Sequence, residues 1–536
     1  MRRPCVTTEP EAATGRRFPQ SAAFLPMLAI AAVAVAFRAP DLDLRPMHAD
    51  ESVQAAIFRK LWLEGDYAYD PREFHGPTLP YATLPSAWLS GAGSFAETTE
   101  ATYRAVPAAF GVGAVLLIGF FHGGLGRLAA LSAALLAAIS PAMVFYSRYY
   151  IHETLLVFFT LGAVLFAWRY VQTGRLGWCL AAGACAGLMQ ATKETAVLSF
   201  FAAAAASGIN SAVGRTCPAG QSGERAAVRL PHLALGAAAA ALVAAALFSS
   251  FCANPRGPLD AVLTYRPWLE RAGGVSPHAN PWYFYLHRLA WWRWDQGPVW
   301  SEGLILGLAA AGFLAAWLPR RLLGGASLPL VRWLGFYTLV LTAVYAAIPY
   351  KTPWCALQVL APMTLLAGVG AAAAVGAMPA RPLKLLVAAL LVAAAGQLGW
   401  QSYRASYLMP ADPKNPYVFA QTSAKITRLL DDLEEIAAAS PEGRALPIKV
   451  IWDSAYYWPL PWYLRRFERV ELWTHLPADP AAALVIATPR LDRQLTGALD
   501  ESHLMTGYYE IRPQVLAQLW VRMDVWERHL RRLGRL

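Results

Sequence analysis

Four short segments of the chain combine carboxylates with cations or aromatic rings, and each could take part in a group transfer. They are His48 to Glu51, Ser147 to Glu153, Lys193-Glu194, and Tyr350 to Trp354. A carboxylate such as Asp50 can accept the proton of an attacking hydroxyl, while Arg and Lys side chains stabilise charge that develops on a departing phosphate. A neighbouring cation keeps such a carboxylate ionised. These residue types predict transfer of a group from a phosphate, provided that the fold brings the segments together.

The elements that must position these segments are membrane-spanning helices. Of the 536 residues, 56% are apolar and only 15% are charged, whereas soluble domains average roughly 25% charged residues. This composition excludes a disordered chain and an ordinary cytosolic enzyme. The six cysteines form no CxxC pair, so we expect neither a zinc site nor a disulfide framework.

Eleven apolar runs are long enough to cross a hydrocarbon core of roughly 30 Å. Lys193 and Glu194 separate the fifth run from the sixth, and we interpret the first run as a retained span rather than a signal peptide. The runs begin near Ala22, Thr102, Leu128, Ile151, Gly177, Thr195, Leu233, Val299, Leu334, Cys355 and Pro382.

The distribution of basic residues indicates the orientation, because short loops rich in Lys and Arg stay in the cytoplasm during insertion. With the N-terminus inside, the cytoplasmic segments hold fifteen basic and three acidic residues. This excess accounts for the formal net charge of +11, which therefore marks topology and contact with membrane lipid rather than with nucleic acid. We expect a multi-pass protein of the inner (plasma) membrane, with a cytoplasmic N-terminus and all four polar segments outside.

The expected fold class is mainly α, a polytopic membrane protein with about 11 transmembrane helices and a small extracytoplasmic α/β domain at the C-terminus. Residues 1–21 form a cytoplasmic tail, residues 22–400 the transmembrane domain with large outer loops at 39–101 and 252–298, and residues 401–536 the last domain. The C-terminal domain, residues 401–536, contains 17 Lys or Arg and 16 Asp or Glu residues. It contains an amphipathic helix and short strand-like runs, at Ile426 to Ala438, Ile448 to Trp452, Val470 to Trp473 and Ala483 to Ala487.

Each candidate residue also has a structural interpretation. Asp50-Glu51 could be an acidic pair at a helix N-terminus, favoured by the helix dipole. Arg148 and Lys193 could be cations that snorkel from span ends, and Lys351 could cap a short loop. The aromatic residues of the loop 252–298 could form an interfacial belt. The shared face of the four segments, together with their acidic companions, favours the functional interpretation.

The order of these segments resembles the GT-C superfamily of membrane glycosyltransferases, which includes protein O-mannosyltransferases and the lipid A aminoarabinose transferase. The closest resemblance is to archaeal and bacterial membrane proteins associated with protein glycosylation. In the superfamily an Asp-Glu pair follows the first span, as Asp50-Glu51 does here, and an acidic residue with an upstream Arg follows the third. The motifs typical of the closer group are matched by Thr192-Lys193-Glu194, by Tyr350 to Trp354 and, in altered form, by Phe74 to Pro77.

The resemblance covers roughly Ala22 to Trp400 and implies inverting transfer of a sugar from a polyprenyl-phosphate donor. It makes Asp50 the general base, with Glu51 orienting it or binding the acceptor, and Glu153 arranging the donor or a cation. His152-Glu153 departs from the Asn-Asp that the closer group often has, which puts the role of Glu153 in doubt. The residues expected to hold the donor phosphate are Arg148, Lys193 and Lys351; those expected to line the substrate are His48, His75, Glu194, Tyr350, Trp354, His278 and Trp282.

No cofactor is certain, since the superfamily is divided on metal use. Asp50, Glu51 and Glu153 could hold a divalent cation if they converge. The expected partners are a polyprenyl-phosphate-linked sugar, membrane lipid and an envelope acceptor that is a protein, a lipid or a glycan. The alternatives are a lipid-linked sugar flippase or transport accessory, and a non-catalytic scaffold. A transporter would show repeated halves and polar residues at mid-membrane, and the sequence has neither.

Overall fold

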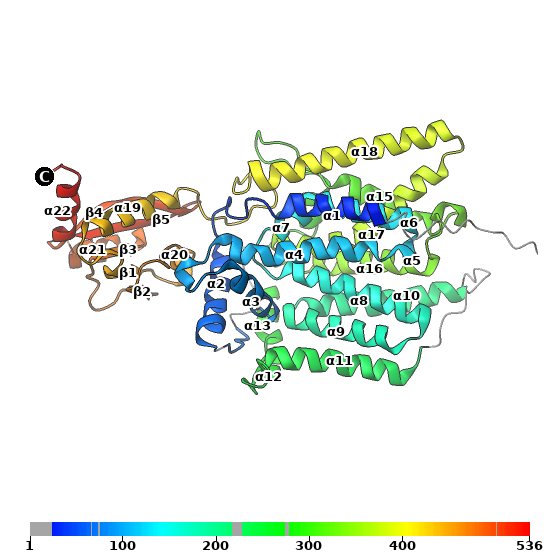
Figure 1. Ribbon diagram of the computed structural model, residues 1–536, viewed down its shortest axis with the longest axis horizontal. Coiled ribbons are helices and arrows are strands. Elements are labelled where there is room, and N and C mark those ends of the chain that lie inside the picture. Colours follow the sequence, from blue (N-terminus) through cyan, green and yellow to red (C-terminus); the bar gives the residue numbers. More distant parts are fainter. Residues whose placement is uncertain (1–23, 66, 73–74, 217–227, 274–277, 500) are drawn as a thin grey trace, which may run out of the picture.

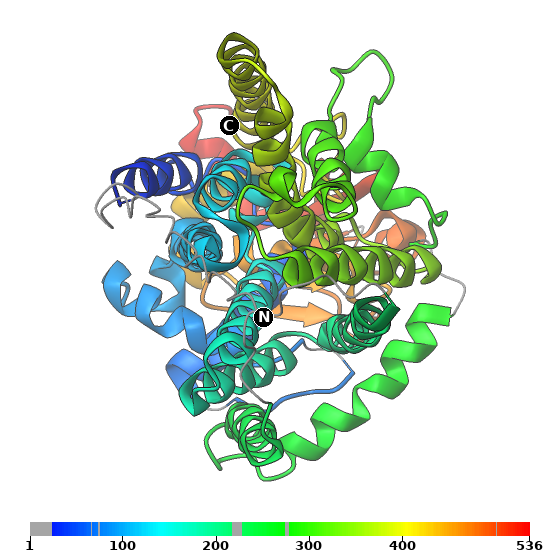
Figure 2. The same cartoon turned by 90° about the vertical axis from the view of Figure 1, so that its right-hand side faces the viewer.

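The computed structural model describes residues 24–65, 67–72, 75–216, 228–273, 278–499 and 501–536. A bundle of apolar helices forms one part of an elongated molecule, and a small domain with a sheet forms the other (Figure 1). Figure 2 looks along the bundle from the end opposite the small domain, whose strands lie behind the helices. The expected fold class is therefore confirmed.

Seven helical segments in the described part of the chain are long and apolar enough to span a membrane. Their helices are α4 (Glu100–Gly119), α8 (Glu153–Thr173), α10 (Ala196–Thr216), α11 (Leu230–Phe248), α16 (Leu328–Ala347), α17 (Ala356–Ala377) and α18 (Arg381–Tyr403). A bent pair, α6 (Arg127–Ile139) and α7 (Pro141–Ser147), forms an eighth candidate with a 58° break. The break follows from Ser140, whose side chain caps α7, and from Pro141, which has no N–H to continue α6.

Three shorter apolar helices complete the set, namely α1 (Phe24–Arg38), α9 (Leu176–Thr192) and α15 (Gly303–Ala315). Each of the eleven predicted runs therefore coincides with an apolar helix or with the bent pair, although the predicted start of the first run at Ala22 lies outside the described residues. That all eleven cross a membrane stays a prediction.

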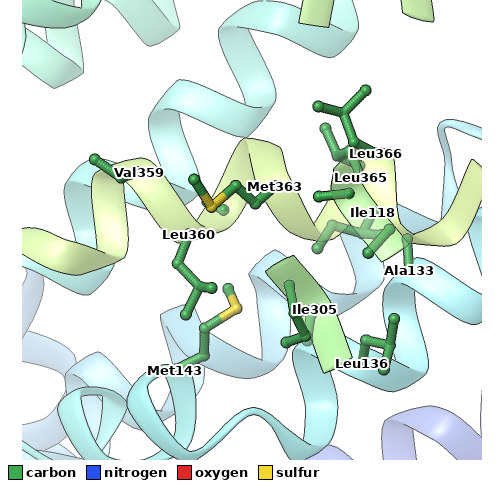
Figure 3. Packing of buried hydrophobic residues seen from close by; sticks show 14 of the residues in the cluster. Ile118, Ala133, Leu136, Met143, Ile305, Val359, Leu360, Met363, Leu365 and Leu366 are labelled. Carbon is green, nitrogen blue, oxygen red and sulfur yellow. The ribbon is translucent and has the colours of Figure 1, made fainter. Parts of the chain in front are cut away.

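Helix α17 forms the core of the bundle and packs against α6 and α15, and its buried side chains belong to one cluster with those of α4, α6, α7 and α15 (Figure 3). The backbones of α15 and α17 approach closely at Gly312 and Gly370. A Cβ on Gly370 would lie 1.9 Å from the Leu308 carbonyl oxygen. Small residues at such crossings allow the van der Waals packing that holds helices together in a bilayer.

Short helices lie at the end of the bundle that faces the small domain (Figure 1). Two come from the first large loop, α2 (Ala49–Arg59), which continues as a π-helix to Glu64, and α3 (Thr78–Ser90). The others are α12 (Gly257–Leu263), α13 (Tyr265–Gly273) and α14 (Phe284–Ala290). The turn between α9 and α10 and the segments before α8 and α17 reach the same end, so the fold gathers the polar segments there.

The small domain contains a five-stranded sheet with strand order β2-β1-β3-β5-β4. The predicted amphipathic helix and first three strands are confirmed as α19 (Ile426–Ala439), β1 (Ile448–Ile451), β2 (Val470–Trp473) and β3 (Leu484–Ala487). These strands are parallel, whereas the last two form an antiparallel hairpin that the sequence did not reveal. The remaining elements are β4 (His503–Arg512), β5 (Val515–Arg522), α21 (Asp492–Leu499) and α22 (Met523–Arg532).

The small domain docks onto the bundle through α20 (Leu460–Tyr463). The indole N–H of Trp462 donates to Glu100 Oε1 at 3.0 Å, and the Tyr463 hydroxyl accepts from the Met47 N–H at 2.8 Å. The Thr422 hydroxyl donates to the Met47 carbonyl at 2.6 Å. These contacts fix the chain immediately before α2, where the first polar segment lies.

Candidate functional site

A cavity of about 350 Å³ opens where the polar segments meet. The polar part of its lining includes Asp50, His75, Glu153, Lys193 and Glu194, which we call the polar wall. The rest of the lining is mostly apolar or aromatic and includes Leu198, Trp268, Tyr285, Tyr345, Ile348 and Trp354. A polar ligand head and an attached apolar chain would find matching surfaces in this one cavity.

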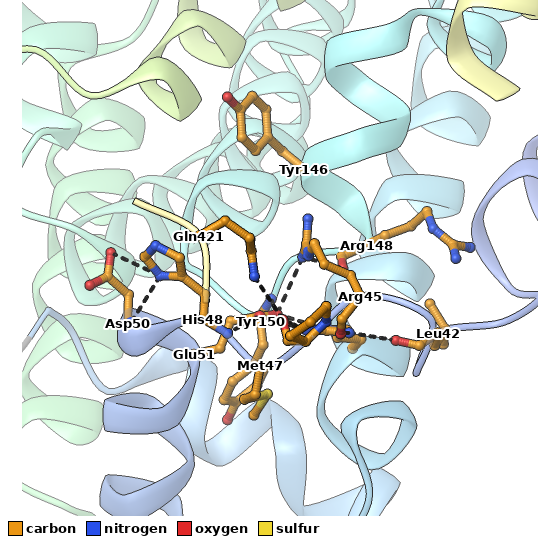
Figure 4. Close-up of polar contacts among 12 residues, drawn as sticks. Leu42, Arg45, Met47, His48, Asp50, Glu51, Tyr146, Arg148, Tyr150 and Gln421 are labelled. Carbon is orange, nitrogen blue, oxygen red and sulfur yellow. Dashed lines mark hydrogen bonds and ion pairs between the residues drawn. The ribbon is translucent and has the colours of Figure 1, made fainter. Parts of the chain in front are cut away.

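Asp50 reaches the cavity because it lies in the first turn of α2, which His48 caps. The His48 ring accepts the Asp50 N–H at 3.0 Å through Nδ1 (Figure 4), and its Nε2 is 2.9 Å from the Phe419 carbonyl oxygen. Burial lowers the pKa of His48, so the ring is neutral, with its proton on Nε2. The Asp50 side chain is 51% exposed and, among the described residues, forms no ion pair with Lys or Arg. The Asp50 side chain therefore lies open to the cavity.

Glu51, the next residue, lies in a different environment. Its carboxylate accepts two hydrogen bonds from Arg104, at 2.8 and 2.6 Å, and one each from the Tyr150 and His48 N–H groups. Burial by itself raises the pKa of Glu51, but the charges of Arg104 and Arg45 and these hydrogen bonds outweigh it and lower the pKa to about 2. Glu51 is fully buried and does not line the cavity. It holds the start of α2, and with it Asp50, in place.

Arg148 also points away from the cavity. Its guanidinium donates to the carbonyl oxygens of Arg38, Pro40 and Asp41 at 2.6 to 3.0 Å, and it lies 4.4 Å from the centre of the Tyr407 ring. In Figure 4 it lies on the opposite side of the cluster from Asp50. We call Arg45, Arg104 and Arg148 the arginine cluster. The structure does not bring Arg148 to the position that the sequence predicted, beside Asp50 and Lys193.

Lys193 and Glu194 lie in the turn between α9 and α10. The Lys193 ammonium forms a buried ion pair with Glu153, at the first residue of α8. Burial lowers the pKa of Lys193, but Glu153 raises it more, so the pKa is raised overall. Glu194 Oε2 is 2.9 Å from His75 Nδ1, and the interaction with a protonated His75 contributes most to lowering the Glu194 pKa to about 2 against the effect of burial. Residues from three distant segments therefore form one charged surface.

His75 reaches this surface because Gly76 allows a close backbone approach. The Gly76 N–H donates to the Thr192 carbonyl at 3.1 Å, and a Cβ at this position would lie 2.1 Å from the Ala191 carbonyl oxygen. The Gly76 carbonyl accepts from His152 Nε2 at 3.1 Å. Burial, together with the charges of His75 and Lys193, holds the pKa of His152 well below its usual value, so this ring is neutral.

The last polar segment contributes Tyr350 and Trp354 to the cavity lining. The Lys351 ammonium turns away and donates to the carbonyl oxygens of Ile348 and Asn280. The ring of His278 lies 5.2 Å from that of Tyr350, and His48 contacts Trp354, but neither imidazole lines the cavity. Trp282 is 67% exposed and lies outside the lining.

The proposed metal ligands do not gather. Within the part of the chain that the structure describes, no group of three or more His, Cys, Asp or Glu side chains is arranged to hold a metal ion. Glu51 is engaged by Arg104 and Glu153 by Lys193, while Asp50 stands apart. A divalent cation at these residues stays an untested prediction.

Sequence reasoning missed residues whose partners are distant in the chain. Arg104, which binds Glu51, carried a signal, because an Arg in the first turn of a predicted span requires a buried partner. Tyr285 and Tyr345 line the cavity but carried no signal, since aromatic rings are common at span ends.

Residues 83–249 match the family model described as Dolichyl-phosphate-mannose-protein mannosyltransferase. No curated protein sequence matches the chain. ArnT from Cupriavidus metallidurans bound to undecaprenyl phosphate has a similar structure, with 15% sequence identity and a TM-score of 0.62; the match covers 92% of this chain and 97% of that one.

The apo oligosaccharyltransferase from Archaeoglobus fulgidus is 14% identical with a TM-score of 0.57, and the match covers 90% of this chain and 71% of that one. The Archaeoglobus fulgidus AglB complex with an inhibitory peptide and a dolichol-phosphate is 13% identical, with a TM-score of 0.54 and the same coverage. These similarities show that the chain shares the fold of ArnT and of the archaeal oligosaccharyltransferase, in agreement with the fold that the resemblance of its motifs predicted.

Proposed function

We propose that the protein is an integral membrane glycosyltransferase that moves a sugar from a polyprenyl-phosphate donor to a hydroxyl of an envelope acceptor, with inversion at the anomeric carbon. The observation that carries this proposal is the cavity, whose lining includes the Asp50 carboxylate, the Lys193 cation and apolar side chains. The GT-C fold and the family match at residues 83–249 support it.

In the proposed reaction Asp50 takes the proton of the acceptor hydroxyl. The acceptor oxygen forms a bond to the anomeric carbon as the bond from that carbon to the phosphate oxygen breaks, and polyprenyl phosphate leaves. Lys193 stabilises the negative charge that shifts onto the leaving phosphate, and Glu153 positions Lys193. Glu51 positions Asp50 by fixing the first turn of α2. Arg148 and Lys351, whose charges are bound by carbonyl oxygens, hold loops rather than the phosphate in this scheme.

The apolar side of the cavity suits the first isoprene units of the donor. Leu198 of α10, Tyr345 of α16 and Ile348 lie on helices or helix ends that belong to the membrane part. We place this end of the bundle outside the plasma membrane, because the loops with excess basic residues are expected in the cytoplasm. The acceptor would approach from the side of the small domain.

The test is a transfer assay in proteoliposomes with radiolabelled polyprenyl-phosphate sugars and an extract of envelope acceptors. Asp50→Asn should lower transfer by about 10²–10⁴-fold, the range expected for removal of a general base. Asp479→Asn is the matched control, since Asp479 is 79% exposed in the small domain. An Asp50→Asn protein with normal transfer would exclude Asp50 as the base, and a lipid-linked sugar that only changes leaflet would favour a flippase.

A further inference from the structure

The polar wall contains more buried negative charge than its lysine can balance. Glu153 and Glu194 are only 2% and 8% exposed, and Lys193 forms its ion pair with Glu153. Among the described residues, no Lys or Arg forms an ion pair with Glu194, whose side-chain partner is His75. A buried carboxylate that stays ionised requires a hydrogen-bonded or charged partner, and among the described residues the imidazole of His75 is the side chain that lies within hydrogen-bond distance of Glu194.

The second nitrogen of His75 is available to a ligand. Nδ1 faces Glu194 at 2.9 Å, whereas Nε2 has no hydrogen-bond partner among the residues that the structure describes. The side chain lines the cavity and is 38% exposed. Its ring packs edge-on against His152 with 5.2 Å between centroids, so its orientation is fixed from two sides.

We propose that His75 binds the donor phosphate as an imidazolium, with Nδ1–H donating to Glu194 and Nε2–H donating to a phosphate oxygen beside Lys193. This inference rests on the proposed function. A phosphate that enters the cavity meets three carboxylates, of Asp50, Glu153 and Glu194, and one ammonium. A proton on His75 adds a second cation and a charge-assisted hydrogen bond. Binding of the phosphate is therefore coupled to uptake of one proton.

The other titratable groups that face His75 lie on several elements. Glu194 and Lys193 lie in the turn between α9 and α10, His152 and Glu153 at the start of α8, Asp50 on α2, and Tyr265, whose hydroxyl contacts the Glu194 carbonyl, on α13. Burial and the charge of Lys193 keep His152 neutral, Glu153 keeps Lys193 charged, and burial raises the pKa of Tyr265. An imidazole is the side chain that most readily changes its charge near neutral pH.

Proton uptake can be counted by calorimetry on the full-length protein in nanodiscs. The probe is a polyprenyl methyl phosphate, a phosphodiester that carries one fixed charge near neutral pH, and the neutral polyprenol is the comparison ligand. Titrations at pH 7.5 in buffers of different ionisation enthalpy should show uptake approaching one proton for the phosphodiester and none for the polyprenol. Affinity for the phosphodiester should fall as the pH rises, by up to tenfold per pH unit, because its binding takes up a proton.

His75→Gln should weaken phosphodiester binding by about tenfold or more and abolish proton uptake, while His75→Lys should restore the affinity and remove its dependence on pH. His475→Gln, at an exposed imidazole of the small domain, is the matched control for the substitution. Equal binding and equal proton uptake by native protein and His75→Gln would overturn the inference. Unchanged binding with a large loss of transfer in His75→Gln would also overturn it, while leaving the proposed transferase intact. A native protein that binds no phosphodiester lipid would overturn the proposed function itself.

Discussion

The arginine cluster and the polar wall lie side by side at the same end of the bundle, yet they satisfy their charges in opposite ways. In the arginine cluster, every guanidinium donates to backbone carbonyls, to Glu51 or to both. In the polar wall, the Asp50 carboxylate and one nitrogen of His75 face a cavity. The first arrangement fixes loops, and the second leaves polar atoms for a ligand. A charged side chain in a membrane protein therefore indicates a ligand site only when its hydrogen-bond and ion-pair partners are known.

The sharpest test of this contrast compares two adjacent residues. Glu51→Gln removes the charge that pairs with Arg104, and an uncompensated buried charge costs about 3–5 kcal/mol. We expect a large drop in thermal stability in detergent. Asp50→Asn, whose side chain is half-exposed, should change stability by less than about 0.5 kcal/mol.

The double variant Glu51→Gln with Arg104→Met serves as the control, because it removes both charges. It should recover part of the lost stability relative to Glu51→Gln alone, which a double-mutant cycle measures. Equal stability of the Asp50 and Glu51 variants would show that the two carboxylates do not differ as the structure indicates.

A smaller effect is expected from the segment that carries His75. Gly76→Ala places a methyl group 2.1 Å from the Ala191 carbonyl oxygen, so the loop must shift away from α9. Overpacking of this kind costs about 1–3 kcal/mol. It should also separate His75 from Glu194 and weaken donor binding. Gly208→Ala on α10, where a Cβ meets no atom within 4 Å, is the control; a Gly76→Ala protein with native affinity would contradict the account.

Arg148→Lys should have a modest effect that is confined to stability. Lysine cannot reproduce the fork that binds three carbonyl oxygens, and the loss of such hydrogen bonds costs about 1 kcal/mol. The KM for the donor should stay unchanged in transfer assays on the folded protein. A selective rise in that KM would instead restore the phosphate-binding role that the sequence predicted for Arg148.

The smallest effect is the change in the stability of the folded protein with pH. Because the Glu194 pKa is lowered to about 2 in the folded protein from an ordinary value of 4.5, its contribution to stability is complete above about pH 4.5. That contribution is lost as the pH falls from about 4.5 toward 2. The difference in melting temperature between native protein and Glu194→Gln should therefore shrink as the pH falls from about 4.5 toward 2. A difference that stayed constant down to pH 2 would contradict the shift.

Much of the fold was predictable because membrane insertion depends on properties local in sequence. Hydropathy alone located eleven apolar helical segments, and alternating patterns located α19 and the first three strands of the small domain. The β4–β5 hairpin was missed because its strands mix charged, aromatic and small residues. Their burial depends on β3, with which β5 pairs.

The candidate site was predictable as a set of segments but not as a set of contacts. The sequence placed Asp50, Glu153, Lys193, Glu194 and Trp354 at one face, and all of them line the cavity. It also placed Arg148 and Lys351 there, yet both bind carbonyl oxygens instead. Residue type and topology cannot distinguish these cases, because an Arg or Lys at a span end is equally suited to a phosphate and to a ring of carbonyls.

The sequence by itself determined that this chain is a helical membrane protein whose polar segments share one end, because hydropathy and the placement of basic residues act on each segment independently. Only the tertiary structure decided which charged groups are paired within the protein and which are available to a ligand. That outcome depends on angstrom-scale approaches between residues such as Glu51 and Arg104, or His75 and Glu194, which are 53 and 119 positions apart in the chain. Hydrogen bonds and ion pairs act only at such distances.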